Sequence, residues 1–236
     1  MDPSTFAVPH TLANLESLLP PPPARVLEAG CGRGALAAAL AELGYDVTGV
    51  DRDADQAAAA RERGVTVIEA DVRDVSGEYD VVLFTRSLHH ADDLDGILAH
   101  ARTLLAPGGQ LVVEEFAWDL VDQAAADFLY DSGALLVAAG LLDAEIPSGD
   151  LLDSWVAGHD FLHRGSAMLT ALDRVGSDLT VVETSMLWRL VSGRGGTWTE
   201  PSSRVADVLD AVRRAEERRI AAGTLPAVGV LASVRR

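Results

Sequence analysis

The feature that most constrains the fold is a buried strand that runs directly into a glycine-rich turn, V-L-E-A-G-C-G-R-G at residues 26–34. Glycine lets the backbone approach a ligand closely and adopt conformations that other residues resist. Gly34 opens an Ala-rich helix over residues 35–43, and the first N–H groups of such a helix point toward a ligand bound at the turn. The sequence therefore predicts a strand–turn–helix unit that holds a nucleotide-like ligand.

The spacing of the glycines separates two classes of ligand. The dinucleotide fingerprint G-x-G-x-x-G places its third glycine three residues after the second. Here the spacing is G-x-G-x-G, and Glu28 stands two residues before the first glycine. A carboxylate at this position would repel a pyrophosphate but attract the ammonium of an aminoacyl group. The segment therefore favours S-adenosylmethionine over NAD.

Four further segments have the pattern of buried strands, and they cover residues 47–51, 65–71, 79–85 and 109–116. In open α/β sheets ligands bind beyond the carboxyl ends of the strands, which is where Asp51, Asp71 and Arg86 fall. Asp51 follows the glycine turn by about 20 residues, the position from which a carboxylate accepts both hydroxyls of a ribose. Asp71 is placed to accept a hydrogen bond from an adenine amino group. The alternative is that both acids are ordinary strand-end and helix-cap residues.

In this order and spacing, residues 25–117 resemble the core of a class I S-adenosylmethionine-dependent methyltransferase. The matching segments are V-L-E-A-G-C-G-R-G, V-T-G-V-D, E-A-D-V, Y-D-V-V-L-F and L-L-A-P-G-G-Q-L-V-V. The resemblance implies an α/β, Rossmann-like fold with a seven-stranded sheet, an antiparallel last strand, and a helical insertion or lid after the fifth strand. It also implies an enzyme that converts S-adenosylmethionine to S-adenosylhomocysteine.

The resemblance assigns a part of the cofactor to each matching residue. Residues 28–32 would hold the methionine portion, Asp51 would bind the ribose, and Arg52 would flank the adenine. Asp71 and the backbone of Val72 would bind the adenine edge, and Thr85 with Arg86 would line the sulfonium end. The predicted cofactor-binding set is Glu28, Ala29, Gly30, Cys31, Gly32, Asp51, Arg52, Asp71, Val72, Thr85 and Arg86.

The charge of the chain indicates which classes of substrate it can bind. The formal net charge is −17, which argues against a nucleic-acid substrate because phosphate neutralisation needs a basic face. All basic residues are Arg, so no lysine is present for Schiff-base or Walker chemistry. Arg213, Arg214, Arg218 and Arg219 are interleaved with Glu216 and Glu217 on one predicted helix, which indicates a solvated face. We expect a small-molecule substrate.

Cysteine usage and hydropathy indicate a compartment. The chain has one cysteine, Cys31, so no intrachain disulfide forms, as expected for a cytoplasmic protein. Small size explains a cysteine in the glycine turn better than nucleophilic catalysis does. Residues 1–19 lack the pattern of a signal peptide, and no stretch approaches the roughly 20 apolar residues of a membrane span. We therefore expect no membrane partner.

The chain divides into four predicted parts. Residues 1–24 form an N-terminal lead or lid that ends in the run Pro20–Pro23, and residues 25–117 form the cofactor-binding core. Residues 118–180 form a helical substrate-binding insertion, and residues 181–236 complete the core sheet with strands at 181–191 and 227–234 and a helix at 203–222. The predicted helix at 122–140 is apolar around most of its circumference, so it is buried, walls a pocket or forms a homodimer face.

The candidate catalytic residues are histidines. Trp155, His159 and His163 follow one another at steps of four, which on a helix places them on one face. They form a substrate wall with a general base, a metal pair, or a structural aromatic face. No H-E-x-x-H acid or third ligand accompanies them, so we predict no metal. His90, just after the fourth strand, is a secondary candidate base.

The candidate substrate-binding residues are Trp118, Trp155 and Glu115, of which Glu115 is expected to face the crevice from the end of the fifth strand. We expect methyl transfer to an oxygen or nitrogen, or to a carbon, of a small molecule in bacterial secondary metabolism. Two alternatives are a cofactor-binding protein that catalyses a cyclisation or rearrangement, and a non-catalytic scaffold subunit.

Overall fold

The structure is a computed structural model of the chain, and it describes residues 4–193, 195–199 and 202–236. These residues form two compact units. The sheet unit comprises the chain up to Glu115 together with His163–Val182 and Val230–Arg236. The helical unit comprises Phe116–Leu162 and Glu183–Gly229.

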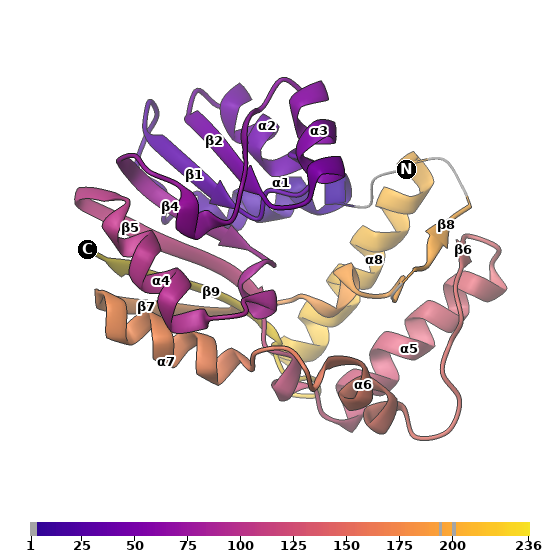
Figure 1. Ribbon diagram of the computed structural model, residues 1–236. Coiled ribbons are helices and arrows are strands. Elements are labelled where there is room, and N and C mark those ends of the chain that lie inside the picture. The colour runs from indigo at the N-terminus through magenta and orange to yellow at the C-terminus, as the bar shows by residue number, and fades with distance from the viewer. Residues whose placement is uncertain (1–3, 194, 200–201) are drawn as a thin grey trace. The chain divides into compact units, whose positions relative to one another are not determined.

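A seven-stranded sheet has the strand order β3-β2-β1-β4-β5-β9-β7 (Figure 1). Neighbouring strands from β3 to β5 are parallel. The last strand is antiparallel to β5, because the backbone N–H of Arg236 donates to Gly109 O while that of Ala117 donates to Val228 O. The predicted seven-stranded sheet with its reversed last strand is confirmed. The strands are β1 (Arg25–Ala29), β2 (Asp46–Asp51), β3 (Thr66–Glu69), β4 (Tyr79–Thr85), β5 (Leu105–Phe116), β7 (Ser177–Thr184) and β9 (Gly229–Arg235).

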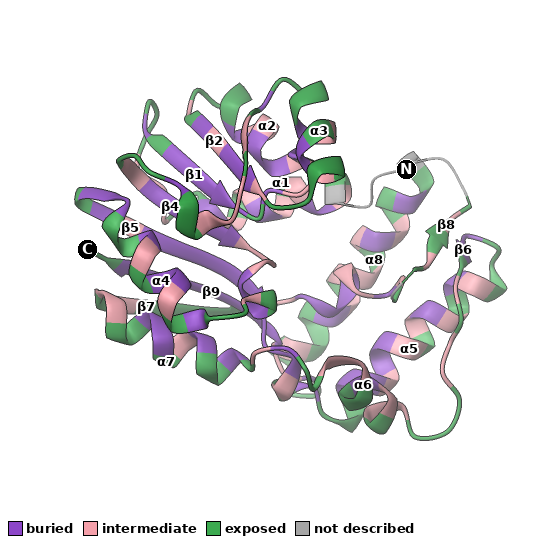
Figure 2. Cartoon of the chain, in the orientation of Figure 1, coloured by how far each residue is buried: buried purple, intermediate pink, exposed green. Residues whose placement is uncertain are grey.

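The central strands are continuous apolar runs because both of their faces are covered. Val81, Val82 and Leu83 of β4 are all fully buried (Figure 2). On one face, helix α2 (Ala35–Glu42) packs into a cluster that includes Val81, Leu83 and Leu15. Leu15 ends helix α1 (Ser4–Leu15), so the predicted N-terminal lead is a helix that packs against α2. The lead is therefore part of the core.

Three other helices of the sheet unit are α3 (Ala54–Glu62), α4 (Leu94–Thr103) and α7 (Gly165–Val175). The side chain of Asp53 accepts from the first N–H groups of α3, and Asp93 does the same for α4. Such caps satisfy backbone donors that have no partner within the helix. The short 3₁₀ helices η1 (Val72–Asp74) and η2 (Leu88–His90) follow β3 and β4.

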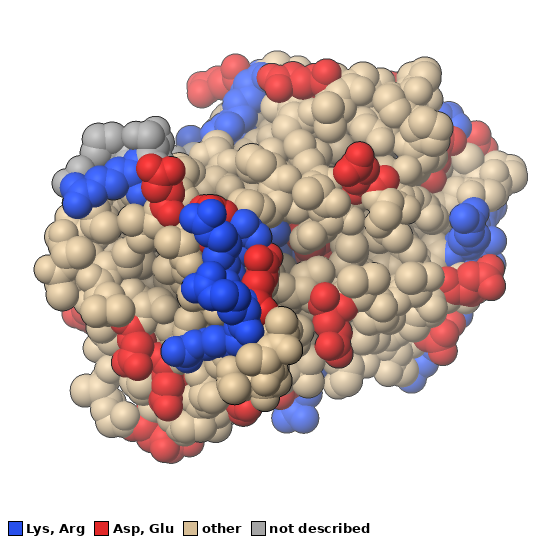
Figure 3. Space-filling model, turned by 180° about the vertical axis from the view of Figure 1, so that it is seen from behind, with Lys and Arg blue, Asp and Glu red and all other residues tan. Residues whose placement is uncertain are grey.

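The helical unit contains α5 (Gln123–Ala138), α6 (Leu151–His159), α8 (Ser202–Ala221), the 3₁₀ helices η3 (Trp118–Leu120) and η4 (Leu187–Arg189), and the short antiparallel pair β6 (Leu142–Asp143) and β8 (Thr197–Trp198). Arg side chains gather over α8 with acidic neighbours between them (Figure 3). Arg213 pairs with Asp210 and Glu217. The predicted solvated face therefore includes Glu217 but not Glu216, which is buried and accepts from three backbone N–H groups of residues 186–188.

Two predicted boundaries differ from the structure. Helix α6 ends at His159, so His163 does not share its face, and the prediction of one helical face carrying Trp155, His159 and His163 is wrong for His163. His163 follows the end of the helix by four residues, and its N–H donates to His89 O within the sheet unit. Residues 163–182 also cluster with the sheet, whereas residues 183–229 cluster with α5 and α6. The predicted strand at 181–191 is the end of β7 followed by η4.

Across the described ranges, no helix is both long and apolar enough to span a bilayer. Within the same ranges, no group of three or more His, Cys, Asp or Glu side chains is arranged to hold a metal ion.

Candidate active site

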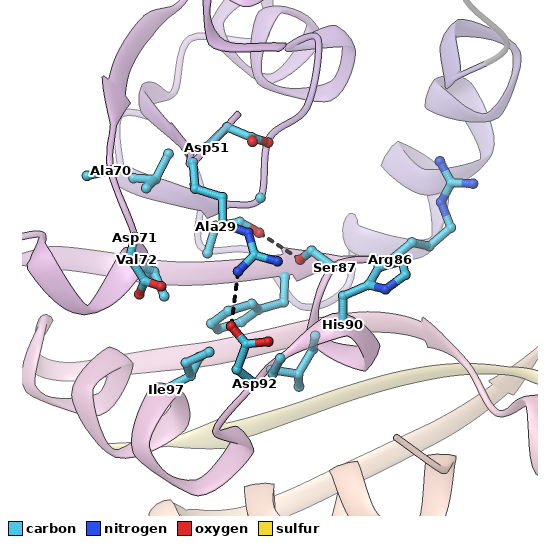
Figure 4. Close-up of a pocket in the computed structure, with 16 residues that line it drawn as sticks. Ala29, Asp51, Ala70, Asp71, Val72, Arg86, Ser87, His90, Asp92 and Ile97 are labelled. Carbon is cyan, nitrogen blue, oxygen red and sulfur yellow. Dashed lines mark hydrogen bonds and ion pairs between the residues drawn. The ribbon is translucent and has the colours of Figure 1, made fainter. Parts of the chain in front are cut away.

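Two cavities lie at the carboxyl ends of the parallel strands, and the described residues that line them all belong to the sheet unit. The first has a volume of about 320 Å³ and is lined from β1, β2, β4, α4 and the segments that follow β3 and β4 (Figure 4). The second has a volume of about 260 Å³ and lies between the glycine turn, the ends of β4 and β5, and α1. Gly30 and Arg86 line both, so the two cavities adjoin.

The glycine turn needs its glycines for steric reasons. Gly30 has φ +74°, and a Cβ added there would lie 2.5 Å from Cβ of Ser87. Ser87 is held in that place because its hydroxyl donates to Ala29 O at 2.7 Å. Gly34 also has φ +74°, and its added Cβ would lie 2.7 Å from Cβ of Ala60 in α3. The turn is thus packed between the segment after β4 and α3.

Asp51 ties the glycine turn to the end of β2. Its Oδ2 accepts the N–H of Gly32 at 2.7 Å, and its Oδ1 accepts the N–H of Asp53 at 3.0 Å. Asp51 also lines the first cavity (Figure 4). Each carboxylate oxygen has a second lone pair, so both remain competent to accept a further hydrogen bond.

Glu28 places a carboxyl group with an unsatisfied oxygen on the second cavity. The side chain is 2% exposed, and its Oε1 accepts the Thr85 hydroxyl at 3.1 Å. Its Oε2 is buried and has no hydrogen-bond partner among the described residues. Burial raises the pKa of Glu28 to about 8, against the opposing effect of the Thr85 hydrogen bond. A buried oxygen of this kind calls for a donor, and an ammonium group satisfies it.

Glu114, and not Glu115, is the acid of β5 that lines a cavity. Glu114 is fully buried and accepts hydrogen bonds from Thr11 and Asn14 of α1, at 2.9 and 3.0 Å. Glu115 lines neither cavity; its Oε1 accepts the N–H of Leu88 at 2.7 Å. The expectation that Glu115 faces the crevice is therefore wrong for these cavities. Successive side chains of a strand point to opposite faces, and here the glycine-turn side belongs to Glu114.

The first cavity carries the residues predicted to surround adenine. Asp71 is held by Arg73 through two parallel hydrogen bonds of 2.9 and 2.8 Å. The hydrogen bond from Arg73 lowers the pKa of Asp71 to about 2, so Asp71 is ionised at neutral pH. Val72 lines the same cavity, and Arg52 pairs with Asp92 at 3.1 Å (Figure 4). Since the side chains of that pair are 63% and 69% exposed, it contributes little to stability.

The end of β4 connects the two cavities. Arg86 has φ +52°, a left-handed conformation that is rare for residues other than glycine, and its N–H donates to Glu114 O at 2.8 Å. Backbone strain of this kind concentrates at functional sites. Thr85 lines the second cavity beside Glu28. Ala29 and Gly32 of the predicted set also line a cavity, so every predicted cofactor-binding residue lies on one of the two.

Cys31 lines the second cavity as a protonated thiol. Burial raises the pKa of Cys31 to about 12, and the nearby carboxyl groups of Glu28 and Asp51 add to this effect. A thiol that stays protonated at neutral pH is a poor nucleophile. The structure thus supports packing, not covalent catalysis, at this position.

The three candidate bases have different surroundings. His90 is exposed and lines the first cavity. His163 contacts Ala91 O through Nε2 at 2.8 Å, and His159 contacts Trp155 O through Nδ1 at 2.7 Å. Because a carbonyl only accepts, each of these ring nitrogens is the one that carries the proton, and the other nitrogen of a neutral ring is the basic one.

Trp118 and Trp155 belong to a buried aromatic cluster of the helical unit. The indole N–H of Trp155 donates to Trp118 O at 2.9 Å, and that of Trp118 donates to Leu162 O at 3.3 Å. The ring of His159 stacks on Trp155 with centroids 3.7 Å apart, and Phe116 meets both rings edge-on. These contacts satisfy both indoles within the unit, and a contact of either with substrate stays a prediction.

Sequence patterns missed several residues that line the cavities. The segment after β4 contributes Ser87, Leu88, Ala91 and Asp92, and α1 contributes Ala7, Val8 and Thr11. For α1 a signal was available, because residues 1–24 were expected to form an N-terminal lead or lid, and the three lining residues lie within that range. For the segment after β4 no signal was available beyond its position at a strand end.

A parallel sheet with a reversed last strand, a glycine turn and acids at the ends of β1, β2 and β3 is the arrangement of class I S-adenosylmethionine-dependent methyltransferases. Residues 8–160 match the family model described as "Methyltransferase domain". This match spans more than half of the chain, and the chain belongs to that family.

Curated relatives match over a shorter part of the chain. The ubiquinone biosynthesis O-methyltransferase of Pectobacterium atrosepticum is 39% identical over 97 residues, which cover 37% of this chain and 40% of that protein. The protein of the same name from Xanthomonas axonopodis pv. citri is 34% identical over 113 residues, which cover 44% of this chain and 47% of that protein. The matched region is therefore less than half of the length of these relatives.

Solved structures resemble the chain over nearly its whole length. An S-adenosylmethionine-dependent methyltransferase from Mesorhizobium loti has a TM-score of 0.59 and 18% identity, and the match covers 98% of each chain. A methyltransferase from Thermotoga maritima, described as a possible histamine N-methyltransferase, has a TM-score of 0.57 and 18% identity over 99% of this chain and 90% of the other. At this identity the similarity shows the fold.

Proposed function

We propose that the protein transfers the methyl group of S-adenosylmethionine to an oxygen atom of a small-molecule acceptor. The observation that carries the proposal is the pair of adjoining cavities in which all predicted cofactor-binding residues lie, with an unsatisfied carboxyl oxygen of Glu28 in one of them. Oxygen as the acceptor atom is supported by the similarity to the two O-methyltransferases.

The residues that line the cavities suit the parts of the cofactor. Glu28 would accept hydrogen bonds from the ammonium group, and the ionised form of Glu28 is favoured once a cation is beside it. Asp51 would accept from the ribose hydroxyls with its remaining lone pairs. Asp71, fixed and ionised by Arg73, would accept from the adenine amino group. The orphaned oxygen of Glu28 is the observation of this structure that fits S-adenosylmethionine.

When bound, the cofactor supplies a methyl group already activated by a sulfonium sulfur. The protein's own residues then have to align the acceptor, keep water away and remove the acceptor's proton. The apolar, aromatic cluster around Trp118 and Trp155 is suited to the walls of an acceptor site, as expected for residues 118–180. A histidine is suited to the proton because its unperturbed pKa is near neutrality.

The first test is product formation. Purified protein is incubated with S-adenosylmethionine and a panel of hydroxylated and amine acceptors, and S-adenosylhomocysteine and methylated product are quantified together. We expect equal amounts of both with at least one hydroxylated acceptor, and none with Asp51→Ala. Product with amines alone would contradict the oxygen assignment. Conversion of an acceptor with neither consumption of S-adenosylmethionine nor formation of S-adenosylhomocysteine would contradict methyl transfer and support the cyclisation or rearrangement alternative, in which the sulfonium charge assists and the cofactor is left unchanged.

The roles of the histidines are tested by three substitutions, His90→Gln, His159→Gln and His163→Gln. Loss of a general base lowers kcat by roughly 10²- to 10⁴-fold. For the histidine that is the base, the substitution removes only proton transfer, so the affinity for S-adenosylhomocysteine should stay within about twofold of wild type. Wild-type turnover in all three variants would show that none of them is the base and that their role is packing.

A further inference from the structure

The segment that follows β4, residues 86–91, is fixed in part by two side chains that line neither cavity, those of Glu115 and His89. Five of its residues, Arg86, Ser87, Leu88, His90 and Ala91, line the first cavity. The remaining residue, His89, is 6% exposed and points away from it into the protein. The side chains that contact His89 therefore help to position the neighbouring residues that line the cavity.

Glu115 provides such contacts. Its Oε1 accepts the N–H of Leu88 at 2.7 Å and the N–H of His89 at 3.3 Å. Its Oε2 lies 2.7 Å from Nδ1 of the His89 ring. Glu115 is 1% exposed and His89 is 6% exposed, so all three interactions take place away from solvent, where hydrogen bonds are stronger than in water.

Three further hydrogen bonds fix the same segment to other elements. His163, just before α7, donates its backbone N–H to His89 O at 3.1 Å and contacts Ala91 O through Nε2 at 2.8 Å. The Ser87 hydroxyl donates to Ala29 O. The centroids of the His89 and His90 rings lie 4.1 Å apart, so the two rings are in contact. The segment is thus held between β1, β5 and the start of α7.

We propose that Glu115 and His89 are positioning residues, which act on the cofactor through the segment 86–91 and make no contact with it themselves. This inference rests on the proposed function, because it takes S-adenosylmethionine as the ligand of the two cavities. Misplacement of a binding group by about 1 Å can reduce catalysis by roughly 10²-fold, so the pair is expected to matter although neither residue lines a cavity.

The helical unit offers a matched control for the test. Glu216 is also fully buried, and it accepts hydrogen bonds from three backbone N–H groups, those of Met186, Leu187 and Trp188 at η4, where Glu115 accepts from two and contacts the His89 ring. It lines neither cavity. Glu216→Ala therefore removes the same number of buried hydrogen bonds as Glu115→Ala, and it separates a general loss of stability from an effect on the cavities.

The experiment measures the affinity for S-adenosylhomocysteine by titration calorimetry at a temperature at which circular dichroism shows every variant to be folded. We expect Glu115→Ala to weaken binding by about tenfold or more, while Glu216→Ala leaves it unchanged. Glu115→Gln keeps the acceptor for both backbone N–H groups and should restore affinity to within about threefold of wild type. His89→Phe, which removes only the ring contact, gives an intermediate loss and serves where Glu115→Ala does not fold. These figures follow from the effects of misplaced binding groups.

A second readout needs no ligand. The chain has six histidines, so the ring C2–H signal of His90 is assignable by NMR with His90→Gln as reference. Glu115→Ala should shift that signal, and Glu216→Ala should not. Unchanged affinity and an unchanged signal in Glu115→Ala, or equal losses in Glu216→Ala, would overturn the positioning role. Failure of the wild-type protein to bind S-adenosylhomocysteine would instead contradict the proposed function, and the NMR result would still decide the positioning role.

Discussion

At the scale of single residues, the cavities are defined by carboxyl groups whose surroundings differ sharply. Asp71 is ionised because Arg73 holds it, whereas Glu28 is mostly protonated at neutral pH because it is buried with one oxygen unsatisfied. Ionisation of Glu28 is therefore linked to any cation that binds beside it. The affinity for an ammonium-bearing ligand therefore depends on pH, and it rises as Glu28 loses its proton.

We expect the affinity for S-adenosylhomocysteine to rise between pH 6 and 8, by up to about tenfold per pH unit, because binding releases the proton of Glu28. Calorimetry in buffers of different ionisation enthalpy measures that proton directly. Glu28→Gln should remove the pH dependence and weaken binding at pH 8 by roughly tenfold, the value of a charge-assisted hydrogen bond. The other titratable or charged groups that line this cavity are Cys31, Arg33, Arg86 and Glu114. An equally steep pH profile in Glu28→Gln would show that the released proton does not come from Glu28.

The raised pKa of Glu28 also affects the free energy of unfolding of the ligand-free protein. The folded protein keeps the proton of Glu28 up to about pH 8, whereas the unfolded chain releases it near the ordinary value of 4.5. The folded state thus binds more protons between these values, and Glu28 makes the free energy of unfolding fall as the pH rises through this window. Glu28→Gln should flatten this part of the stability profile, as measured by urea unfolding.

At the scale of elements, the strand–turn–helix unit depends on Gly34, which begins α2 against α3. Gly34→Ala brings a Cβ to 2.7 Å from Cβ of Ala60 and forces a left-handed conformation on alanine. We expect a loss of roughly 2–5 kcal/mol, from backbone strain of about 1–2 and overpacking of about 1–3 kcal/mol. Gly64→Ala is the matched control, because Gly64 also has positive φ but meets nothing within 4 Å. Equal losses in urea unfolding would remove the packing explanation.

Sequence patterns located strands β1 to β5 and β9 because each contains an apolar run that ends in a turn, whereas the strand expected at 181–191 is β7 at Ser177–Thr184. The predicted cofactor-binding residues line the two cavities because they stand at or near the ends of strands. Sequence patterns did not distinguish Glu114 from Glu115. Both side chains are buried, one toward α1 and one toward η2, and only the positions of those two elements show which acid lines a cavity. They also placed His163 on α6, because the four-residue spacing of Trp155, His159 and His163 is the same whether or not the helix extends to His163. In both cases the missing information is a tertiary contact.

At the scale of the whole molecule, all described residues that line the two cavities belong to the sheet unit, which is built from three separate segments of the chain. The helical unit is built from the two segments between them and contains the aromatic cluster of Trp118 and Trp155. The curated relatives match only 37% and 44% of this chain. As part of the proposed function, we predict a division of labour, in which the sheet unit binds the cofactor and residues of the helical unit contribute to the acceptor site.

Hydrogen–deuterium exchange tests this division on the intact protein. S-adenosylhomocysteine alone should slow exchange in the glycine turn and in the segments after β2 and β4, because ligand binding suppresses local opening where contacts form. Exchange in α5 and α8 should stay unchanged until an acceptor from the product assay is added. Protection of α5 or α8 by S-adenosylhomocysteine alone would show that the helical unit takes part in cofactor binding. Protection of neither helix by the acceptor would place the acceptor site within the sheet unit, and His90 would then be the base to pursue.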